Sequence, residues 1–436
     1  MRIDHLHVKN FKGFQDKEFS FHPQFNLIVG VNGTGKTSVL DALSIAVGSW
    51  FLGIRGYDTR PIRSQEVHLA SFEAENIHDN NRRTVGVHWE PQYPCSVKAV
   101  GEILGNNISW LRTLNSLGGR TTYGEATAIK SLAANADASV RSGKEIILPL
   151  ISYYGTGRLW DAPREQAQVK DEKALTRKES LSRFAGYRNS VDPRLSVTEL
   201  MRWIARQSWI SYQQGSQPTL LYEVVQKAIV GCVEGATHLY FDASFGEVIV
   251  EINQGRQPFN NLSDGQRCML AMVGDMAQKA AVLNPHLSDK ALEETPGVVL
   301  IDELDLHLHP KWQRRIIEDL RRTFPKIQFF TTTHAPQLVG QIKPEEIFLL
   351  DSRNEKHPGQ SYGMDSNWIL RHIMGSDDRD PDISIRLDAL FEAIEAANFS
   401  EANKEIIALR REIGDHPDLV EAEAIIARYT RFNDEE

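Results

Sequence analysis

The sequence is poor in cysteine and has no long apolar run. Its three cysteines, Cys95, Cys232 and Cys268, lie far apart without a CxxC pair, so neither a disulfide framework nor a cysteine zinc site is expected. The longest apolar runs, near residues 146–151 and 296–301, are much shorter than the ~18 residues that a membrane helix needs. Residues 1–14 interleave charged with apolar residues, which is not typical of a signal peptide. These absences predict a soluble, cytoplasmic protein.

An excess of basic residues is also missing. The 436 residues include 49 Lys and Arg against 58 Asp and Glu, a net charge of −9. This balance argues against a protein whose whole surface binds nucleic acid, although a local basic groove remains compatible with it. Hydrophobic residues at 41% and charged residues at 25% are ordinary for a folded chain. The length corresponds to about three domain-sized units of ~150 residues each.

A glycine-rich turn carries the most specific motif. Residues 25–29 predict a strand and residues 36–47 a helix, and residues 30–37 between them read Gly-Val-Asn-Gly-Thr-Gly-Lys-Thr, which matches the phosphate-loop pattern G-x-x-x-x-G-K-[ST]. Backbone N–H groups of such a loop wrap phosphates, its lysine reaches the terminal phosphates and its Thr hydroxyl ligates Mg²⁺. We therefore predict a nucleoside triphosphate with Mg²⁺, bound by Asn32, Gly33, Thr34, Gly35, Lys36, Thr37 and Ser38.

Two acidic residues follow a second apolar strand. Residues 298–301 are all apolar and lead into Asp302 and Glu303. Asp302 is expected to hold Mg²⁺ through water, and Glu303 is placed to act as the general base on the attacking water. Acidic residues often follow buried strands, and it is the pairing with the phosphate loop that favours the catalytic interpretation.

Two further motifs complete an ordered set. Leu262-Ser-Asp-Gly-Gln266 precedes Asp302, and Leu304-Asp305 and a strand-terminal His334 follow it. This order resembles the head of ATP-binding-cassette (ABC) ATPases, an α/β P-loop fold with a RecA-like core, a β-rich lobe and a helical signature lobe.

The resemblance implies that ATP is shared between two heads. Ser263, Gly265 and Gln266 would cap the nucleotide of a second subunit, although Asp264 stands where transporters most often have glycine. Asp305 would cross the dimer seam, and His334 would contact the terminal phosphate beside the catalytic Glu303.

The opening residues point to one branch of this family. Asn10-Phe-Lys-Gly-Phe14 resembles the start of the RecF, SMC and OLD branch, which implies that Lys12 lies near the nucleotide; a solvated lysine is the alternative. No heptads separate the phosphate loop from the signature, so long coiled-coil arms are not expected. The family also uses a glutamine as a metal ligand, for which Gln65 is the candidate and Gln92 the rival.

Three segments narrow the resemblance to the PtuA family of the Septu anti-phage systems. They are Tyr-Tyr-Gly-Thr-Gly-Arg at 153–158, Asp-Glu-Leu-Asp-Leu-His-Leu-His-Pro at 302–310, and Tyr-Gly-Met-Asp-Ser at 362–366. The resemblance implies a homo-oligomeric ATPase that holds a separate HNH nuclease and controls its DNA cleavage through the nucleotide state. The alternative is a RecF-like DNA-repair clamp that binds DNA itself, whereas a transporter ATPase lacks support.

The predicted organisation is an ATPase head at 1–350, with a compact insertion lobe at about 48–260, and a helical interaction region at 351–436. Within the head, helices are expected at 262–283, capped by Ser263, and from Lys311 to Phe324. Amphipathic helices are expected at 384–397, 400–413 and 418–432. The acidic cluster at 377–382 is interpreted as a solvated turn. His307 and His309 are interpreted as part of the loop at 305–310, which the resemblance places at the dimer seam and which we call the seam loop. This chain is therefore not expected to be a nuclease.

Overall fold

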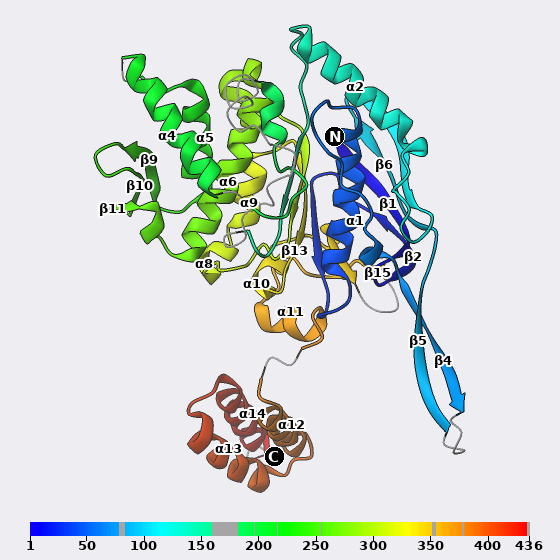
Figure 1. Ribbon diagram of the computed structural model, residues 1–436. Coiled ribbons are helices and arrows are strands. Elements are labelled where there is room, and N and C mark those ends of the chain that lie inside the picture. Colours follow the sequence, from blue (N-terminus) through cyan, green and yellow to red (C-terminus); the bar gives the residue numbers. More distant parts are fainter. Residues whose placement is uncertain are drawn as a thin grey trace. The chain divides into compact units, whose positions relative to one another are not determined.

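The computed structural model divides the chain into two compact units, Met1–Ser366 and Asn367–Glu436 (Figure 1). It describes residues 1–77, 83–158, 182–195, 197–215, 217–253, 255–350, 355–376 and 379–433. The charged stretch at 166–178 lies outside the described residues.

The first unit is built on a six-stranded sheet in the order β15-β14-β3-β13-β12-β8. Its strands are β3 (Phe25–Val29), β8 (Leu150–Tyr154), β12 (Gly297–Ile301), β13 (Ile327–Thr332), β14 (Ile347–Leu350) and β15 (Glu355–Lys356). Strands β14, β3, β13, β12 and β8 run parallel, and every residue of β3, β8, β12 and β13 is buried. Continuous apolar runs are typical of parallel strands covered on both faces. The predicted α/β P-loop fold is confirmed.

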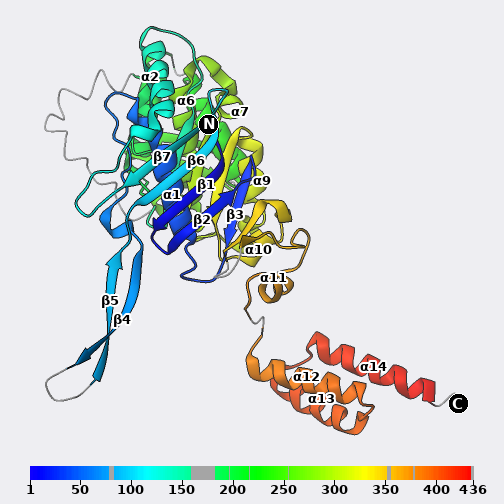
Figure 2. The same ribbon diagram turned by 90° about the vertical axis from the view of Figure 1, so that its right-hand side faces the viewer.

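A second, antiparallel sheet has the order β2-β1-β6-β7. Its strands are β1 (Arg2–Phe11), β2 (Phe14–Ser20), β6 (Cys95–Ile103) and β7 (Asn106–Leu114). A separate hairpin, β4 (Leu69–Ile77) and β5 (Arg83–Pro91), projects away from this sheet (Figure 2). The range 48–260, predicted as one insertion lobe, therefore supplies β6 and β7 to one sheet and β8 to the other.

Helix α1 (Lys36–Gly48) is packed between the two sheets. It contacts β12 and β13 on one side and β1, β6 and β7 on the other. Eleven of its residues are buried. The indole N–H of Trp110, on β7, donates to the Ala46 carbonyl at 3.0 Å. A helix that is apolar nearly all round is expected in such an enclosed position, which fixes the start of α1 relative to both sheets.

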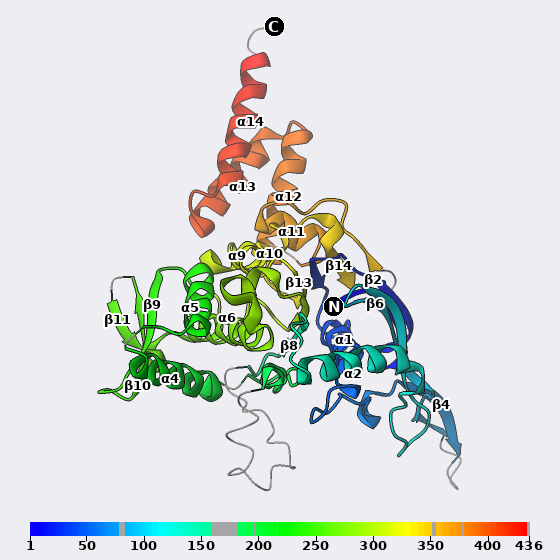
Figure 3. The ribbon, with the colours of Figure 1, turned by 90° about the horizontal axis from the view of Figure 1, so that it is seen from above.

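Most of the remaining elements of the first unit lie beside the central sheet in a largely helical layer, whereas α2 (Thr127–Arg141) packs against β7 (Figure 3). The longer elements of the layer are α4 (Val197–Gln213), α5 (Leu220–Cys232), β9 (Ala236–Asp242), β10 (Glu247–Ile252), β11 (Gly255–Pro258) and α6 (Asp264–Leu283). Further short helices of the first unit are η1 (Ser49–Leu52), η2 (Ser64–Glu66), η3 (Gly124–Ala126), η5 (Arg183–Tyr187), η6 (Phe259–Asn261), η7 (Pro285–Lys290), α7 (Ala291–Glu294), α10 (Pro336–Val339) and η8 (Pro344–Glu346). None of the helices described is both long and apolar enough to cross a membrane.

The helix predicted from Lys311 to Phe324 is wrong in one respect, because it is broken in two. Helix α8 (Pro310–Gln313) ends before α9 (Ile316–Thr323) begins, and the backbone of Arg315 between them departs from helical geometry with φ −119°. Glu234 fixes α8 by accepting the indole N–H of Trp312 at 3.1 Å and pairing with Lys311 at 2.8 Å. Periodicity alone could not reveal this tertiary anchor.

The second unit contains α11 (Ser366–His372), α12 (Pro381–Glu395), α13 (Phe399–Ile413) and α14 (Pro417–Asn433). The three amphipathic helices predicted here are confirmed within a few residues at each end. They bury one shared apolar cluster: Leu387, Leu390, Ile394, Ala402, Ile406, Leu409, Leu419, Ala422 and Ile426. Buried apolar area is the main favourable contribution to folding, so these helices have a core of their own.

Leu409→Ala tests whether this core is independent of the ATPase head. Leu409 is fully buried, and such truncations cost about 2–5 kcal/mol. We expect faster amide hydrogen exchange across residues 381–433 and unchanged exchange in β3, β12 and β13, measured on the full chain. The exposed Ile407→Ala is the control and should leave both regions unchanged. Equal acceleration in both regions would contradict the prediction.

Candidate nucleotide-binding site

The phosphate loop adopts a conformation that requires glycine. Gly33 and Gly35 have φ values of +87° and +102°, in the left-handed region. A Cβ on Gly35 would lie 2.7 Å from the Phe14 ring, and one on Gly30 would lie 2.7 Å from the Leu350 carbonyl. The loop is therefore held between the end of β14 and the start of β2. Glycine is needed at positions 30 and 35 because a side chain there would collide with these neighbours.

Lys36 lies across this loop. Its ammonium donates to the carbonyls of Gly30 at 2.7 Å and Val31 at 3.2 Å, and the residue is buried. Burial lowers the pKa of Lys36, and the nearby carboxylates of Asp302, Glu303 and Asp305 only partly oppose this effect. A desolvated cation inside a ring of backbone groups is suited to a phosphate ligand.

Thr37 and Asp302 are brought together from distant parts of the chain. The Thr37 hydroxyl donates to Asp302 Oδ2 at 2.9 Å, and the Thr332 hydroxyl donates to Asp302 Oδ1 at 2.6 Å. Asp302 is buried, and its backbone N–H donates to the Tyr154 carbonyl at 2.8 Å. Hydroxyl and carboxylate oxygens are the ligands that Mg²⁺ prefers, so the donor set fits this ion and Thr37 and Asp302 would hold it.

Glu303 has a constrained backbone and an open carboxylate. Its φ is +50°, which is uncommon for a residue with a side chain, and its N–H donates to the Thr332 hydroxyl at 2.7 Å. Among the described residues, no hydrogen bond or ion pair engages the Glu303 carboxylate. A half-buried carboxylate with free lone pairs can accept a proton from water.

Asp305 and His334 are linked through the backbone. Asp305 Oδ1 accepts the Thr333 hydroxyl at 2.6 Å and the His334 N–H at 3.3 Å. The His334 side chain itself is exposed. The predicted seam residue thus fixes the turn that follows β13 and presents His334.

The signature residues begin helix α6. The Ser263 hydroxyl accepts the Gln266 N–H at 3.4 Å, and Gln266 Oε1 accepts the Ser263 N–H at 3.0 Å, which forms a reciprocal cap. A Cβ on Gly265 would lie only 2.3 Å from the His307 carbonyl. Gly265 is therefore required for packing against the seam loop within its own chain.

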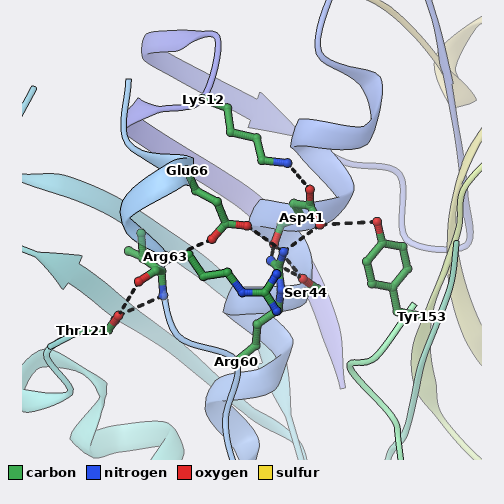
Figure 4. A network of polar contacts seen from close by, with 9 residues as sticks. Lys12, Asp41, Ser44, Arg60, Arg63, Glu66, Thr121 and Tyr153 are labelled. Atoms are coloured by element: carbon green, nitrogen blue, oxygen red, sulfur yellow. Dashed lines mark hydrogen bonds and ion pairs between the residues drawn. The ribbon is translucent and has the colours of Figure 1, made fainter. Parts of the chain in front are cut away.

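Lys12 is engaged with the phosphate-loop helix (Figure 4). Its ammonium pairs with Asp41 of α1, about one turn beyond Thr37. Asp41 also accepts from Arg60 at 2.7 Å and from the Tyr153 hydroxyl at 3.4 Å. Burial, together with the charges of Asp41 and Asp302, raises the pKa of Tyr153 well above its usual value, so it remains a donor. A direct contact of Lys12 with nucleotide stays a prediction.

The role of Gln65 as a metal ligand stays a prediction. Gln65 is exposed on η2, and no hydrogen bond joins it to Thr37 or Asp302. Gln92 donates instead to the Glu90 carbonyl at 2.9 Å. The neighbours of Asp302 come instead from the segment at and after the end of β8. Tyr154 pairs with Ile301, and Arg158 donates to the Asp302 carbonyl.

The other predicted positions also have clear places. Asn32 is exposed at the rim of the loop, Thr34 donates to the Val31 carbonyl at 2.8 Å, and Ser38 is half-buried in the first turn of α1. His309 caps α8, and Asp380 caps α12 by accepting two backbone N–H groups. Within the described residues, no group of three or more His, Cys, Asp or Glu side chains could hold a metal ion. Asp377 and Asp378 lie outside the described residues.

Sequence reasoning missed two residues of the site. Thr332 bridges Asp302 and Glu303, but a threonine inside a buried strand gives no signal of its own. Arg158 donates to the carbonyls of Asp302 at 2.7 Å and Glu303 at 2.8 Å. The segment at 153–158 contributes to the family resemblance, but the sequence does not indicate that Arg158 contacts these two carbonyls.

Two family models described as AAA domains match this chain, at residues 5–207 and 130–340, and the description of the second adds a putative AbiEii toxin of a type IV toxin–antitoxin system. The Septu protein PtuA of Bacillus thuringiensis is 22% identical over 393 residues, which cover 86% of this chain and 85% of PtuA. The chain is similar to the ABC-type ATPases of the RecF, SMC and OLD branch and resembles PtuA.

The Retron Ec83 probable ATPase of Escherichia coli is also similar to this PtuA-like chain. It is 27% identical over 427 residues, which cover 88% of this chain and 78% of the relative. The sequence analysis did not predict a likeness to retron proteins. The SMC head domain from Thermotoga maritima is 16% identical, with a TM-score of 0.40, over 80% of this chain and 94% of that domain. The AAA matches and the ATPase relatives support ATPase chemistry in this PtuA-like chain.

Lys36→Ala tests the nucleotide site directly. Removing the buried ammonium leaves the loop without its cation, so we expect ATP with Mg²⁺ to lose its effect on the melting temperature. A ligand at 100 times its Kd stabilises a protein by about 2.7 kcal/mol, which is readily measured. Lys311→Ala, which removes an exposed lysine from its pair with Glu234, is the control and should retain the ATP-induced shift. Full ATP stabilisation of Lys36→Ala would contradict the assignment.

Gly265→Ala tests the packing of the signature on the seam loop. The added methyl group would overlap the His307 carbonyl, so α6 must shift. We expect ATP hydrolysis to fall at least about tenfold, because displacements of 1 Å can cost about 100-fold in rate. Gly124→Ala, where the methyl meets open space, is the control. Normal hydrolysis by Gly265→Ala would refute the close approach.

Proposed function

We propose that this chain is the ATP-binding and ATP-hydrolysing scaffold of an anti-phage defence complex, and that its nucleotide state controls a partner HNH nuclease of the PtuB type. The observation that carries the proposal is the Thr37–Asp302 hydrogen bond beside the open Glu303, in a chain that resembles PtuA over most of its length. A phosphate loop and a strand-end acid in contact are the minimum apparatus of a P-loop ATPase.

The chain's residues divide the work of hydrolysis. The phosphate loop and Lys36 would bind the triphosphate, and Thr37 and Asp302 would hold Mg²⁺, whose charge would offset the negative charge of the phosphates. Glu303 orients the attacking water and accepts its proton, because its carboxylate is otherwise unengaged. Asp305 holds the turn that presents His334 toward the terminal phosphate.

Two heads would share the nucleotide. Ser263 and His334 are both exposed in the single chain, although each is fixed by local hydrogen bonds. The N-terminus of α6 carries partial positive charge and N–H groups that favour a phosphate. A second copy would bring these groups to the nucleotide, which links the oligomeric state to ATP.

The nuclease would be supplied by another chain. Among the described residues, no group of three or more His, Cys, Asp or Glu side chains is placed to hold a metal ion. The C-terminal unit has its own core and so can present a separate surface to a partner. Contact with DNA would then be made by the complex, in keeping with the net charge of −9.

The alternative is a RecF-like clamp that binds DNA by itself. The segment Asn10–Phe14 favours it, because this segment resembles the start of the RecF, SMC and OLD branch. ATP-dependent DNA binding by the isolated chain, with a strong loss of affinity at higher salt, would support this alternative.

Glu303→Gln should separate binding from hydrolysis. The amide keeps the size of the side chain but cannot accept a proton as the carboxylate does. We expect ATP binding to persist, hydrolysis to fall about 100-fold or more, and an ATP-bound dimer to accumulate in light scattering. Glu318→Gln, on the exposed face of α9, is the control. Normal turnover by Glu303→Gln would show that another group is the base.

Light scattering of the chain mixed with the product of its neighbouring gene tests the partner. We expect a stable assembly with an HNH protein whose mass depends on ATP and Mg²⁺. If the chain does not bind the product of the neighbouring gene but binds duplex DNA when ATP is present, the RecF-like clamp is favoured instead.

A further inference from the structure

Arg158 is a buried arginine that bonds only uncharged acceptors. The residue is 1% exposed. Its guanidinium donates to the Asp302 carbonyl at 2.7 Å, the Glu303 carbonyl at 2.8 Å, the Gly155 carbonyl at 3.0 Å and Cys268 Sγ at 2.9 Å. No carboxylate pairs with it in the part of the chain that the structure describes. A buried charge is costly without a partner, so this arrangement requires an explanation.

The guanidinium has the geometry to hold two backbone carbonyls at once. Its donors lie in a rigid planar fork, so one side chain can reach the carbonyls of two successive residues. Those two residues are Asp302 and Glu303, the predicted metal ligand and base. Glu303 adopts φ +50°, a conformation that persists only where its surroundings enforce it. Arg158 and Thr332 both hold the peptide between Asp302 and Glu303, Arg158 through the Asp302 carbonyl and Thr332 through the Glu303 N–H, and Arg158 also binds the Glu303 carbonyl.

Arg158 also reaches the signature helix. Its Nε–H donates to Cys268 Sγ, and Cys268 lies on α6, little more than one turn from Ser263. Cys268 is buried, so this contact is protected from water. One side chain therefore joins β8, the end of β12 and the helix that the proposed function assigns to the second nucleotide.

We infer that Arg158 is a positioning residue for ATP hydrolysis, which fixes the backbone of Glu303 and couples it to the signature helix α6. This inference rests on the proposed function, because it takes Glu303 as the base. A shift of α6 against its neighbours moves Cys268 and, through the guanidinium, the peptide that carries the Glu303 carboxylate. The residue acts through Glu303 and does not itself contact nucleotide.

Arg158→Lys is the primary test. Lysine keeps the positive charge, but its single ammonium cannot reach both carbonyls and the Cys268 sulfur at once. We expect the Kd for ATP to stay within about threefold and the single-turnover hydrolysis rate to fall at least about tenfold, since small misplacements of a catalytic group cost this much. In the Glu303→Gln background, Arg158→Lys should cause no further loss, because the group that it positions is already absent.

Arg112→Lys is the matched control. Arg112 is equally buried at 1% and also bonds uncharged oxygens, those of Thr122, Ser49 and Thr59. We expect it to lower the melting temperature without changing the hydrolysis rate of bound ATP. The inference is overturned if both variants slow hydrolysis equally, if Arg158→Lys hydrolyses ATP normally, or if it weakens binding as much as turnover. Normal hydrolysis by Glu303→Gln would instead refute the proposed base.

Cys268 provides a second variant in case Arg158→Lys does not fold. Cys268→Ala removes only the sulfur acceptor and should slow single-turnover hydrolysis about threefold at unchanged ATP affinity, in line with the modest strength of one hydrogen bond. Cys268→Ser restores an acceptor and should recover most of the rate. An unchanged rate in Cys268→Ala would refute the coupling to α6.

Discussion

The parallel pairing of β12 between β8 and β13 is the constraint on which the site depends. Because the three strands end at the same edge, Tyr154, Asp302 and Thr332 are neighbours. The backbone N–H of Asp302 is bonded to Tyr154, and its carboxylate is bonded to Thr332. A shift of β12 by one residue would point the Asp302 side chain to the opposite face of the sheet and away from α1.

The two buried charges of the site, Lys36 and Asp302, are bonded to neutral groups and not to each other. Lys36 donates to backbone carbonyls, and Asp302 accepts from two hydroxyls, so no ion pair joins them in the described chain. Burial disfavours the charged form of Lys36 and lowers its pKa. The ammonium and the carboxylate are therefore fixed by neutral groups and remain available to a ligand that carries both charges, an anionic phosphate with its metal cation. This is preorganisation: the site's dipoles are oriented before the ligand arrives.

Sequence analysis predicted the parts of the fold that depend on local pattern. The strand–loop–helix at 25–47, the capped helix α6 and the three C-terminal helices all follow from periodicity, capping residues and glycine positions. It did not predict the break between α8 and α9, or that β6 and β8 belong to different sheets, because the contacts of α8 with Glu234 and the strand pairings join residues far apart in the chain. Arg158 was visible as part of a motif, yet its role depends on carbonyl groups that no pattern reveals.

The separate core of the C-terminal helices has a consequence for how such proteins diversify. Because α12, α13 and α14 pack their apolar residues into a shared cluster, substitutions at their exposed positions leave that cluster intact. Residues 381–433 can therefore differ widely on the outside of the bundle while the three helices keep their own fold.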